Sequence, residues 1–287
     1  MRSMLFVPGD RPERFEKAEA SGADAVILDL EDAVAASQRP KAREAITAHL
    51  QRSSRPVPLW VRINPIDSPD ALIDLVAVVP ARPDGLLLPK ARDGRDVLRF
   101  DHWLEALEAA HGLVAGSIKV IPMITETAGA MLQLASFVPT PPRVVGMTWG
   151  AEDLAIELGA VASRDETGHY DMPYQMASAG CLLTAAAAGV SAIDTVDTEI
   201  KDIAAVEQRA CGSRRGGYTA KLAIHPDQIP ALHSAFTPSA AEVAHAEAVL
   251  AAFSRSPGAG ALRVGGKLVD RPHLLQAERV LAAARRR

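Results

Sequence analysis

Short apolar runs alternate along the chain with longer segments whose apolar residues recur at helical spacing. The runs are mostly apolar instead of alternating, which is typical of strands buried on both faces of a parallel sheet. Eight runs are each followed by a helical segment, and they cover residues 4–7, 25–28, 59–63, 85–88, 118–124, 144–149, 192–196 and 221–224. Eight strand–helix repeats in about 235 residues predict a (β/α)8 TIM barrel, which typically needs about 250 residues.

The remainder of the chain, residues 238–287, does not continue this pattern. An Ala-rich helix is predicted over residues 240–253, and a glycine-rich joint over 256–260. Residues 261–269 read as a hairpin with a Gly-Gly turn, and a closing helix follows over 272–285. We therefore predict a catalytic barrel over residues 1–237 and a C-terminal helical and hairpin extension over 238–287. A small extension on a glycine-rich hinge is a candidate lid, or an arm that reaches a neighbouring subunit.

Two successive runs in the middle of the chain end in acidic residues. Residues 118–124 lead to Glu126, and residues 144–149 lead to Asp153, with an Ala/Leu/Met-rich helix predicted over 128–137 between them. A right-handed crossover joins parallel strands in such a unit, so both strand ends lie at one edge of the sheet. Because neighbouring strands are about 4.8 Å apart, the two carboxylates can share one small, hard cation.

Every predicted strand end carries a charged or strongly polar side chain. These residues are Asp10, Arg11, Asp29, Glu31, Asp32, Arg62, Asn64, Lys90, Glu126, Glu152, Asp153, Asp194 and His225. In a barrel they converge on the active face, which the loops after the strands form. Acids outnumber bases there and no cysteine or paired histidine is among them, so the pattern favours Mg²⁺ or Mn²⁺ over zinc. The plainer alternative is that Asp29 or Asp153 only caps a helix.

Three basic residues at the strand ends admit more than one interpretation. Arg62 offers a planar fork that binds a substrate carboxylate at two points, or it forms an ion pair with Asp29 or Glu31. Lys221 is interpreted as the buried partner of an acid. Schiff-base chemistry at Lys90 or Lys221 stays open, but a metal serving as electron sink makes it unnecessary.

Composition narrows the class of partner and the compartment. The chain has 287 residues, 48% hydrophobic and 23% charged, with a net charge of −4, which gives no reason to expect nucleic acid or an anionic membrane as a partner. Cys181 and Cys211 lie among small residues without metal-site spacing, and we interpret both as reduced core thiols. No window approaches the roughly 18 apolar residues of a membrane helix. A cytoplasmic protein is expected.

Eight ordered motifs resemble one known family. They are RSMLFVPG at residues 2–9, LDLEDAV at 28–34, VRIN at 61–64, LPK at 88–90, TETA at 125–128, GAEDL at 150–154, KLAIHP at 221–226 and VDRPH at 269–273. Together they resemble the HpcH/HpaI aldolase and citrate lyase superfamily, and more narrowly its citrate lyase beta-subunit-like branch. The match runs over the whole chain, including the extension.

The resemblance implies a Mg²⁺-dependent carbon–carbon lyase, in which Mn²⁺ is a possible substitute. The substrate would be a 3-hydroxyacyl-CoA with a carboxylate on its hydroxyl carbon, such as citramalyl-, malyl- or citryl-CoA. Metal would be bound by Glu126 and Asp153, and the substrate carboxylate by Arg62. Asp270 would come from the extension of an adjacent subunit and serve in acid/base chemistry, so a homo-oligomer, trimer or hexamer, is expected.

Two further sets of site residues complete the prediction. Glu31 is counted with Arg62 and Asp270 among the candidate catalytic residues. Coenzyme A is expected across the barrel mouth near Arg11, Arg14 and Lys17, where a helix N-terminus also favours phosphate.

Other activities remain open on the same scaffold. One is thioester hydrolysis or malate-synthase-like condensation. Another is the beta subunit of a citrate lyase complex, acting on an acyl-carrier-protein thioester. A third is a binding protein that keeps the metal site without turnover.

Overall fold

The computed structural model describes residues 1–285 and contains an eight-stranded parallel sheet in the order β5-β4-β3-β2-β1-β8-β7-β6. Its strands are β1 Ser3–Pro8, β2 Ala25–Asp29, β3 Leu59–Arg62, β4 Gly85–Leu88, β5 Lys119–Pro122, β6 Gly146–Thr148, β7 Ser191–Asp194 and β8 Ala220–Ala223. Parallel bridges pair Val120 with Val144 and Met123 with Thr148, which connect β5 to β6 and close the ring. The predicted (β/α)8 barrel is thereby confirmed.

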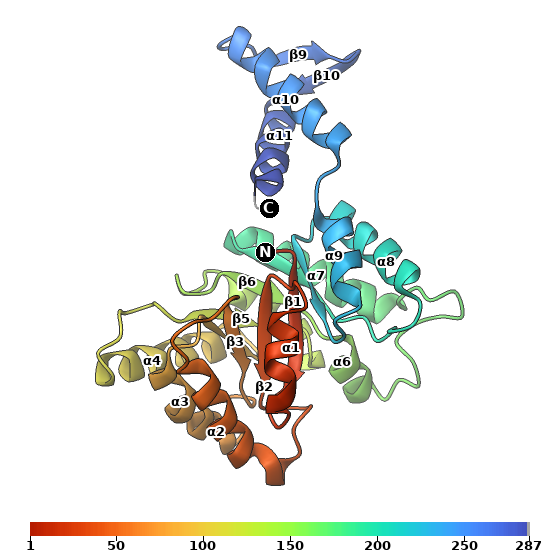
Figure 1. The fold of residues 1–287 in the computed structure, drawn as a ribbon. Helices are drawn as coiled ribbons and strands as arrows, with labels where there is room; N and C mark the ends of the chain where they lie inside the picture. The colour runs from red at the N-terminus through yellow and green to blue at the C-terminus, as the bar shows by residue number, and fades with distance from the viewer. Residues whose placement is uncertain (286–287) are drawn as a thin grey trace. The chain divides into compact units, whose positions relative to one another are not determined.

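Helices surround this ring of strands (Figure 1). They are α1 Phe15–Glu19, α2 Arg39–Leu50, α3 Asp70–Val78, α4 Gly94–Ala110, α5 Ala128–Met131, α6 Ala151–Leu158, α7 Met172–Ala188, α8 Ile203–Gly216 and α9 Gln228–Phe236. Four short 3-10 segments join them: η1 Pro12–Arg14, η2 Ala36–Gln38, η3 Val79–Ala81 and η4 Leu134–Phe137. No helix among residues 1–285 is long and apolar enough to cross a bilayer.

The helix predicted over residues 128–137 is wrong as a continuous element. It forms only as α5 and η4, because Gln133 leaves the helical conformation with φ −120°. The Ser136 hydroxyl then accepts a hydrogen bond from the Gly94 N–H at 3.0 Å, which ties this segment to the start of α4. Gly94 permits the approach, since a Cβ there would lie 2.0 Å from the Ser136 carbonyl oxygen. A tertiary contact has overridden the local helical spacing.

Large apolar side chains from the strands fill the barrel interior. The buried cluster consists of Met4, Ala25, Ile27, Trp60, Leu87, Ile121, Ile193, Ala220 and Leu222. Trp60 is accommodated because the neighbouring strand carries Gly85, where a Cβ would lie 2.2 Å from the indole ring. Trp149 is also buried. The interior is a packed core, so any site lies at a mouth of the barrel.

The two cysteines differ in their surroundings. Cys181 on α7 is buried, as predicted, and burial raises the pKa of its thiol. Cys211 on α8 is exposed, so its prediction as a core residue is wrong. Small flanking residues are equally compatible with the outer face of a helix, which explains the error.

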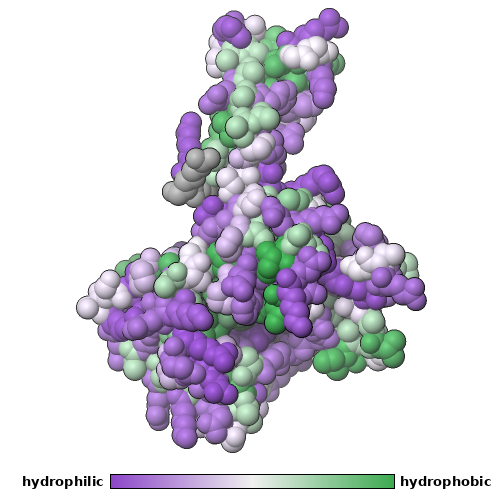
Figure 2. Space-filling model, turned by 45° about the vertical axis from the view of Figure 1, so that its right-hand side comes forward, coloured by the Kyte–Doolittle hydropathy of each residue, from purple (hydrophilic) through white to green (hydrophobic). Residues whose placement is uncertain are grey.

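The face of the molecule shown in Figure 2 is largely hydrophilic, and its hydrophobic areas are separated from one another.

The C-terminal extension is a compact unit of its own. The chain divides after Leu232, inside α9, whereas the sequence placed the division after residue 237. This unit contains α10 Ala240–Arg255, β9 Ala261–Val264, β10 Lys267–Asp270 and α11 Arg271–Ala284, with a core of Ala246, Val249, Val269 and Ala277. Residues 286 and 287 of the predicted extension lie outside the described range.

One prediction for the extension is confirmed and another is wrong. Gly265 and Gly266 form the hairpin turn with φ 57° and 79°, a backbone conformation that glycine adopts without strain. The glycine-rich segment 256–260, however, connects α10 to β9 within the extension. It is therefore not the joint between the extension and the barrel.

Candidate active site

The first part of the site is an ion pair between the ends of β2 and β3. Asp29 and Arg62 are register partners in the sheet, which places their side chains next to each other. The Arg62 Nε and Nη2 donate to the two oxygens of Asp29 at 2.7 and 2.6 Å, and Nη1 lies 3.0 Å from Glu31 Oε2. Burial by itself would lower the pKa of Arg62, but the carboxylates of Asp29, Glu31 and Glu126 together outweigh it and the pKa is raised.

The contacts of Arg62 and Asp29 show how each side chain is held. The predicted ion pair of Arg62 with Asp29 and Glu31 is present and engages all three guanidinium nitrogens, and binding of a substrate carboxylate by Arg62 stays a prediction. Asp29 also accepts the backbone N–H groups of Glu31 and Ala33 at 3.0 and 3.1 Å. These contacts lock the turn after β2, so Asp29 positions Arg62 and does not cap a regular helix.

The second part of the site is the pair of predicted metal ligands. Glu126 follows β5 and is buried, whereas Asp153 lies in the first turn of α6. The N-cap of that helix is Gly150, so a mere capping role for Asp153 is wrong. Burial and then the charges of Asp153 and Glu31 raise the pKa of Glu126 well above its usual range. The structure thus brings the two carboxylates together, and their mutual repulsion calls for a cation.

The atoms around Glu126 fit a hard cation. Two carboxylates supply oxygen donors, and Thr125 and Thr148, at the ends of the same two strands, carry buried hydroxyl oxygens without a hydrogen-bond partner. Mg²⁺ typically takes one or two protein carboxylates and keeps its other positions for water and substrate oxygens. Within residues 1–285 no group of three or more His, Cys, Asp or Glu is arranged to hold a metal by itself. The donor set therefore fits an open Mg²⁺ or Mn²⁺ site.

Gly150 is a site residue whose role the sequence did not reveal. A Cβ at this position would lie 2.7 Å from the Glu126 Cγ and 2.9 Å from its Oε1. Only glycine lets the turn between β6 and α6 pass so close to the carboxylate. The sequence signal for this role was the pattern Gly-x-Glu-Asp directly after a strand.

Lys90 connects the two parts of the site. Its Nζ contacts Glu31, and it lies 3.1 Å from Asp153 Oδ1 and 3.4 Å from Asp32 Oδ2. Its backbone N–H donates to Glu126 Oε2 at 2.5 Å. Burial raises the pKa of Glu31 to about 7, although the charges of Arg62 and Lys90 oppose the rise. The sequence placed Lys90 at a strand end but did not reveal these contacts.

Lys221 is structural. Its Nζ donates to Asp194 Oδ2 at 2.6 Å and to the Thr195 carbonyl at 2.7 Å, and its side chain is buried. Asp194 also accepts the Trp149 Nε1–H at 2.8 Å. The interpretation of Lys221 as the buried partner of an acid is confirmed.

The predicted coenzyme A residues lie after β1. Arg11, Arg14 and Lys17 are exposed, and the helix predicted there forms only as η1 and the five-residue α1. A helix this short contributes little dipole to phosphate binding. The three residues stay a prediction that rests on their positive charge.

Asp270 belongs to the extension, where it is the N-cap residue of α11. Its Oδ1 lies 2.5 Å from His273 Nδ1, and both side chains are half-exposed. The carboxylate is therefore accessible on its own unit, and its predicted role is not decided by these contacts.

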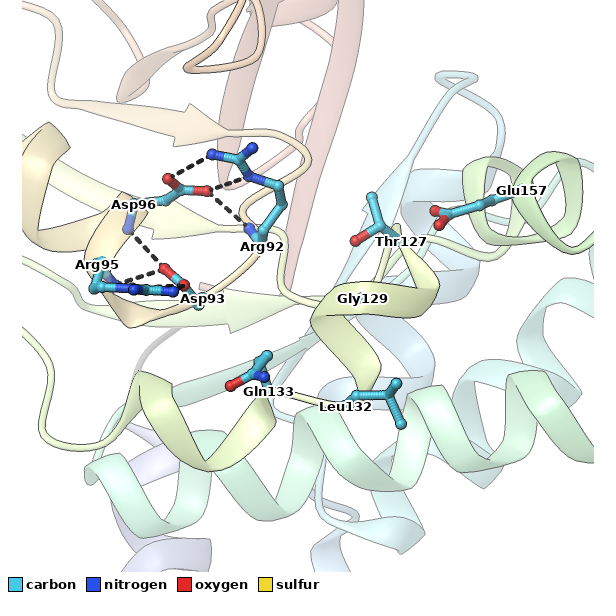
Figure 3. Close-up of a pocket in the computed structure, with 9 residues that line it drawn as sticks. All are labelled: Arg92, Asp93, Arg95, Asp96, Thr127, Gly129, Leu132, Gln133 and Glu157. Atoms are coloured by element: carbon cyan, nitrogen blue, oxygen red, sulfur yellow. Dashed lines mark hydrogen bonds and ion pairs between the residues drawn. The ribbon is translucent and has the colours of Figure 1, made fainter.

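A cavity of about 640 Å³ opens between the segment that leads into α4, the segment around α5, and α6 (Figure 3). It is lined by Arg92, Asp93, Arg95, Asp96, Thr127, Gly129, Leu132, Gln133 and Glu157. Arg92 pairs with Asp96 at 3.0 Å, and Arg95 pairs with Asp93 at 2.6 Å. Because these charges are paired within the wall, the cavity offers no net positive charge to a phosphate.

Comparison with known proteins agrees with this geometry. The sequence model of the HpcH/HpaI aldolase/citrate lyase family matches residues 2–226. A citrate lyase subunit beta-like protein of Mycobacterium tuberculosis is 38% identical over 280 residues, covering 98% of this chain and 94% of the relative. A (3S)-malyl-CoA thioesterase of Cereibacter sphaeroides is 34% identical over 288 residues, covering 99% and 94%. The crystal structure of CitE from M. tuberculosis with magnesium, acetoacetate and coenzyme A superposes with a TM-score of 0.83 at 36% identity, covering 99% of this chain and 97% of CitE.

The raised pKa of Glu31 predicts a pH-dependent stability of the metal-free protein. The folded chain holds this proton up to about pH 7, whereas the unfolded chain loses it near the ordinary value of 4.5. Between these values the unfolded state binds fewer protons, so the free energy of unfolding falls as pH rises, by at most about 3 kcal/mol. Glu31→Gln should make this fall shallower by the share that Glu31 contributes, while the raised pKa of Glu126 keeps part of it. Urea denaturation in EDTA from pH 4.5 to 7.5 measures the difference.

Asp32→Asn is the matched control, because it removes a neighbouring negative charge from an exposed side chain. It should keep most of the wild-type slope. An equal slope in wild type and Glu31→Gln would contradict the prediction.

Proposed function

Because this chain belongs to the HpcH/HpaI aldolase/citrate lyase family, we propose that it is a Mg²⁺-dependent carbon–carbon lyase. Its substrate is a short 3-hydroxyacyl-CoA whose hydroxyl carbon carries a carboxylate: citramalyl-, malyl- or citryl-CoA. The products are acetyl-CoA and an oxo acid. The observation that carries the proposal is one barrel mouth with a guanidinium end at Arg62 and two metal-binding carboxylates at Glu126 and Asp153.

The chemistry divides among the residues of this mouth. Glu126 and Asp153 hold the cation, which supplies Lewis-acid polarisation of the oxo group as it forms. Arg62 binds the substrate carboxylate, and Asp29 fixes the orientation of its guanidinium group. Glu31, whose pKa is raised to about 7, is suited to hold or release a proton near neutral pH.

Two proton transfers accompany cleavage. The hydroxyl proton leaves, and the bond between the hydroxyl carbon and the thioester α-carbon breaks with its electron pair on the α-carbon. That carbon then gains a proton and becomes the methyl group of acetyl-CoA. We assign this acid/base role to Asp270 from the extension of an adjacent subunit, within a homotrimer or homohexamer. The phosphates of coenzyme A lie near Arg11, Arg14 and Lys17.

Similarity to two kinds of protein supports two alternative functions. The (3S)-malyl-CoA thioesterase similarity favours thioester hydrolysis, or its malate-synthase-like counterpart, at the same mouth. The citrate lyase subunit beta-like similarity favours a subunit that acts on an acyl-carrier-protein thioester. The products separate these cases, because a lyase forms an oxo acid, whereas a thioesterase forms free coenzyme A and the intact hydroxy acid.

A thioester panel tests the proposed reaction. Purified protein with Mg²⁺ should convert at least one of citramalyl-, malyl- and citryl-CoA into acetyl-CoA and an oxo acid, and EDTA should abolish the conversion. The oxo acid is detected as its hydrazone and free coenzyme A by a thiol reagent. Free coenzyme A without oxo acid would favour the thioesterase, and activity only on the carrier-protein thioester would favour the subunit. No product from any thioester would contradict catalysis.

The role of Asp270 is tested by Asp270→Asn, which keeps the side-chain volume but removes the base. Turnover should fall by about 100-fold or more while Mg²⁺ binding stays unchanged. Asp202→Asn is the matched control, because Asp202 is also an exposed N-cap aspartate, at the start of α8. It should keep wild-type turnover. Unchanged turnover in Asp270→Asn would exclude the acid/base role.

Mixing two inactive variants separates the inter-subunit arrangement from an intra-subunit one. Asp270→Asn and Arg62→Lys, unfolded and refolded together, should regain activity, because some mouths then combine an intact Arg62 with an intact neighbouring Asp270. No recovery in refolded mixed oligomers would place Asp270 and Arg62 of one site on the same chain.

A further inference from the structure

Lys90 has an unusual backbone conformation for a residue with a side chain. Its φ is 51°, and of the non-glycine residues that the structure describes only Arg82, with φ 57°, shares a positive φ. This left-handed region is disfavoured by the Cβ, so a residue stays there only where surrounding contacts hold it. Lys90 follows β4 by two positions and lies at the active mouth.

The conformation lets one residue contact both sides of the site. The backbone N–H of Lys90 donates to Glu126 Oε2 at 2.5 Å. Its side-chain Nζ contacts Glu31 and lies 3.1 Å from Asp153 Oδ1. Lys90 therefore touches both predicted metal ligands, one through its backbone and the other through its ammonium group.

The charges at this mouth explain why a cation is held there. Glu31, Asp32, Glu126 and Asp153 supply four carboxylates, whereas Arg62 is paired with Asp29 through two nitrogens and with Glu31 through the third. A buried carboxylate cluster without a cation is strongly disfavoured, because like charges repel in surroundings of low dielectric constant. The Lys90 ammonium contacts three of the four carboxylates, so it supplies the missing charge.

We propose that Lys90 is the internal counter-cation of the metal-free site, and that it gives up Asp153 when the divalent cation binds, so that it sets the metal affinity. The inference rests on the metal site of the proposed function. An ammonium group and Mg²⁺ both seek carboxylate oxygens, and two cations a few ångströms apart repel each other. Binding of the metal therefore includes the cost of moving the ammonium group away.

The side chain of Lys90 has room to make this move. It is 26% exposed, and Asp32 beside it is 54% exposed, so the ammonium group can turn toward Asp32 and water. A four-carbon stem with a strongly hydrated head suits such a displacement better than a rigid guanidinium does. The backbone N–H can keep its bond to Glu126 meanwhile, since it does not depend on the side-chain position.

Two variants remove the ammonium group in different ways. Lys90→Met keeps an unbranched chain of similar length, and Lys90→Gly also relieves the left-handed backbone. Both should bind Mg²⁺ about tenfold more tightly than wild type, measured by calorimetric titration of the metal-free protein at pH 8 without thioester. Lys41→Met is the control, because it removes one exposed positive charge on α2, outside the site. Its affinity should equal that of wild type.

Thermal unfolding distinguishes this role from a purely structural ion pair. Without metal, both Lys90→Met and Lys90→Gly should have a lower melting temperature than wild type. The decrease should be smaller for Lys90→Gly. At saturating Mg²⁺ the difference should disappear, because the metal then supplies the missing charge. A deficit that persists in Mg²⁺, or an affinity equal to or weaker than that of wild type, would overturn the proposal. Absence of Mg²⁺ binding in wild type and both variants would overturn the metal site and the proposed function with it.

Discussion

The structure depends on the balance of charge where the strands of the barrel end. Four carboxylates converge there around Lys90. Its ammonium group contacts three of them, and its backbone N–H donates to the fourth, Glu126. A fifth carboxylate, Asp29, is paired with Arg62. A folded chain tolerates buried negative charge only with cations close by. Arg62 balances the side formed by β2 and β3, and Lys90 spans the gap to Glu126 and Asp153. The remaining negative charge favours a divalent cation at this mouth.

The barrel holds this arrangement by its register. Asp29 and Arg62 are paired across neighbouring strands, so the ion pair follows from the sheet and needs no flexible loop. Gly150 similarly holds Glu126 in place, because the turn into α6 passes close enough to confine the carboxylate. This part of the site is thus built on rigid elements of the barrel.

Much of this could be predicted from the sequence because the relevant patterns are periodic. Mostly apolar runs predicted the parallel strands, and a βαβ unit predicted Glu126 and Asp153 at one edge of the sheet. Other features depend on tertiary contacts that periodicity does not encode. The hydrogen bond from Gly94 to Ser136 interrupts a helix that the Ala/Leu spacing favoured. The left-handed backbone of Lys90 and the exposure of Cys211 are likewise decided by their neighbours in space.

The central claim is that Glu126 and Asp153 together hold one hard divalent cation at this mouth. Electron paramagnetic resonance of Mn²⁺, titrated into metal-free protein, measures that binding directly without any substrate. Wild type should bind one Mn²⁺ per chain, and Glu126→Gln and Asp153→Asn should each weaken this binding at least about tenfold. The control Glu152→Gln changes an exposed neighbour on α6 and should bind Mn²⁺ as wild type does. Unchanged Mn²⁺ binding in both Glu126→Gln and Asp153→Asn would contradict it.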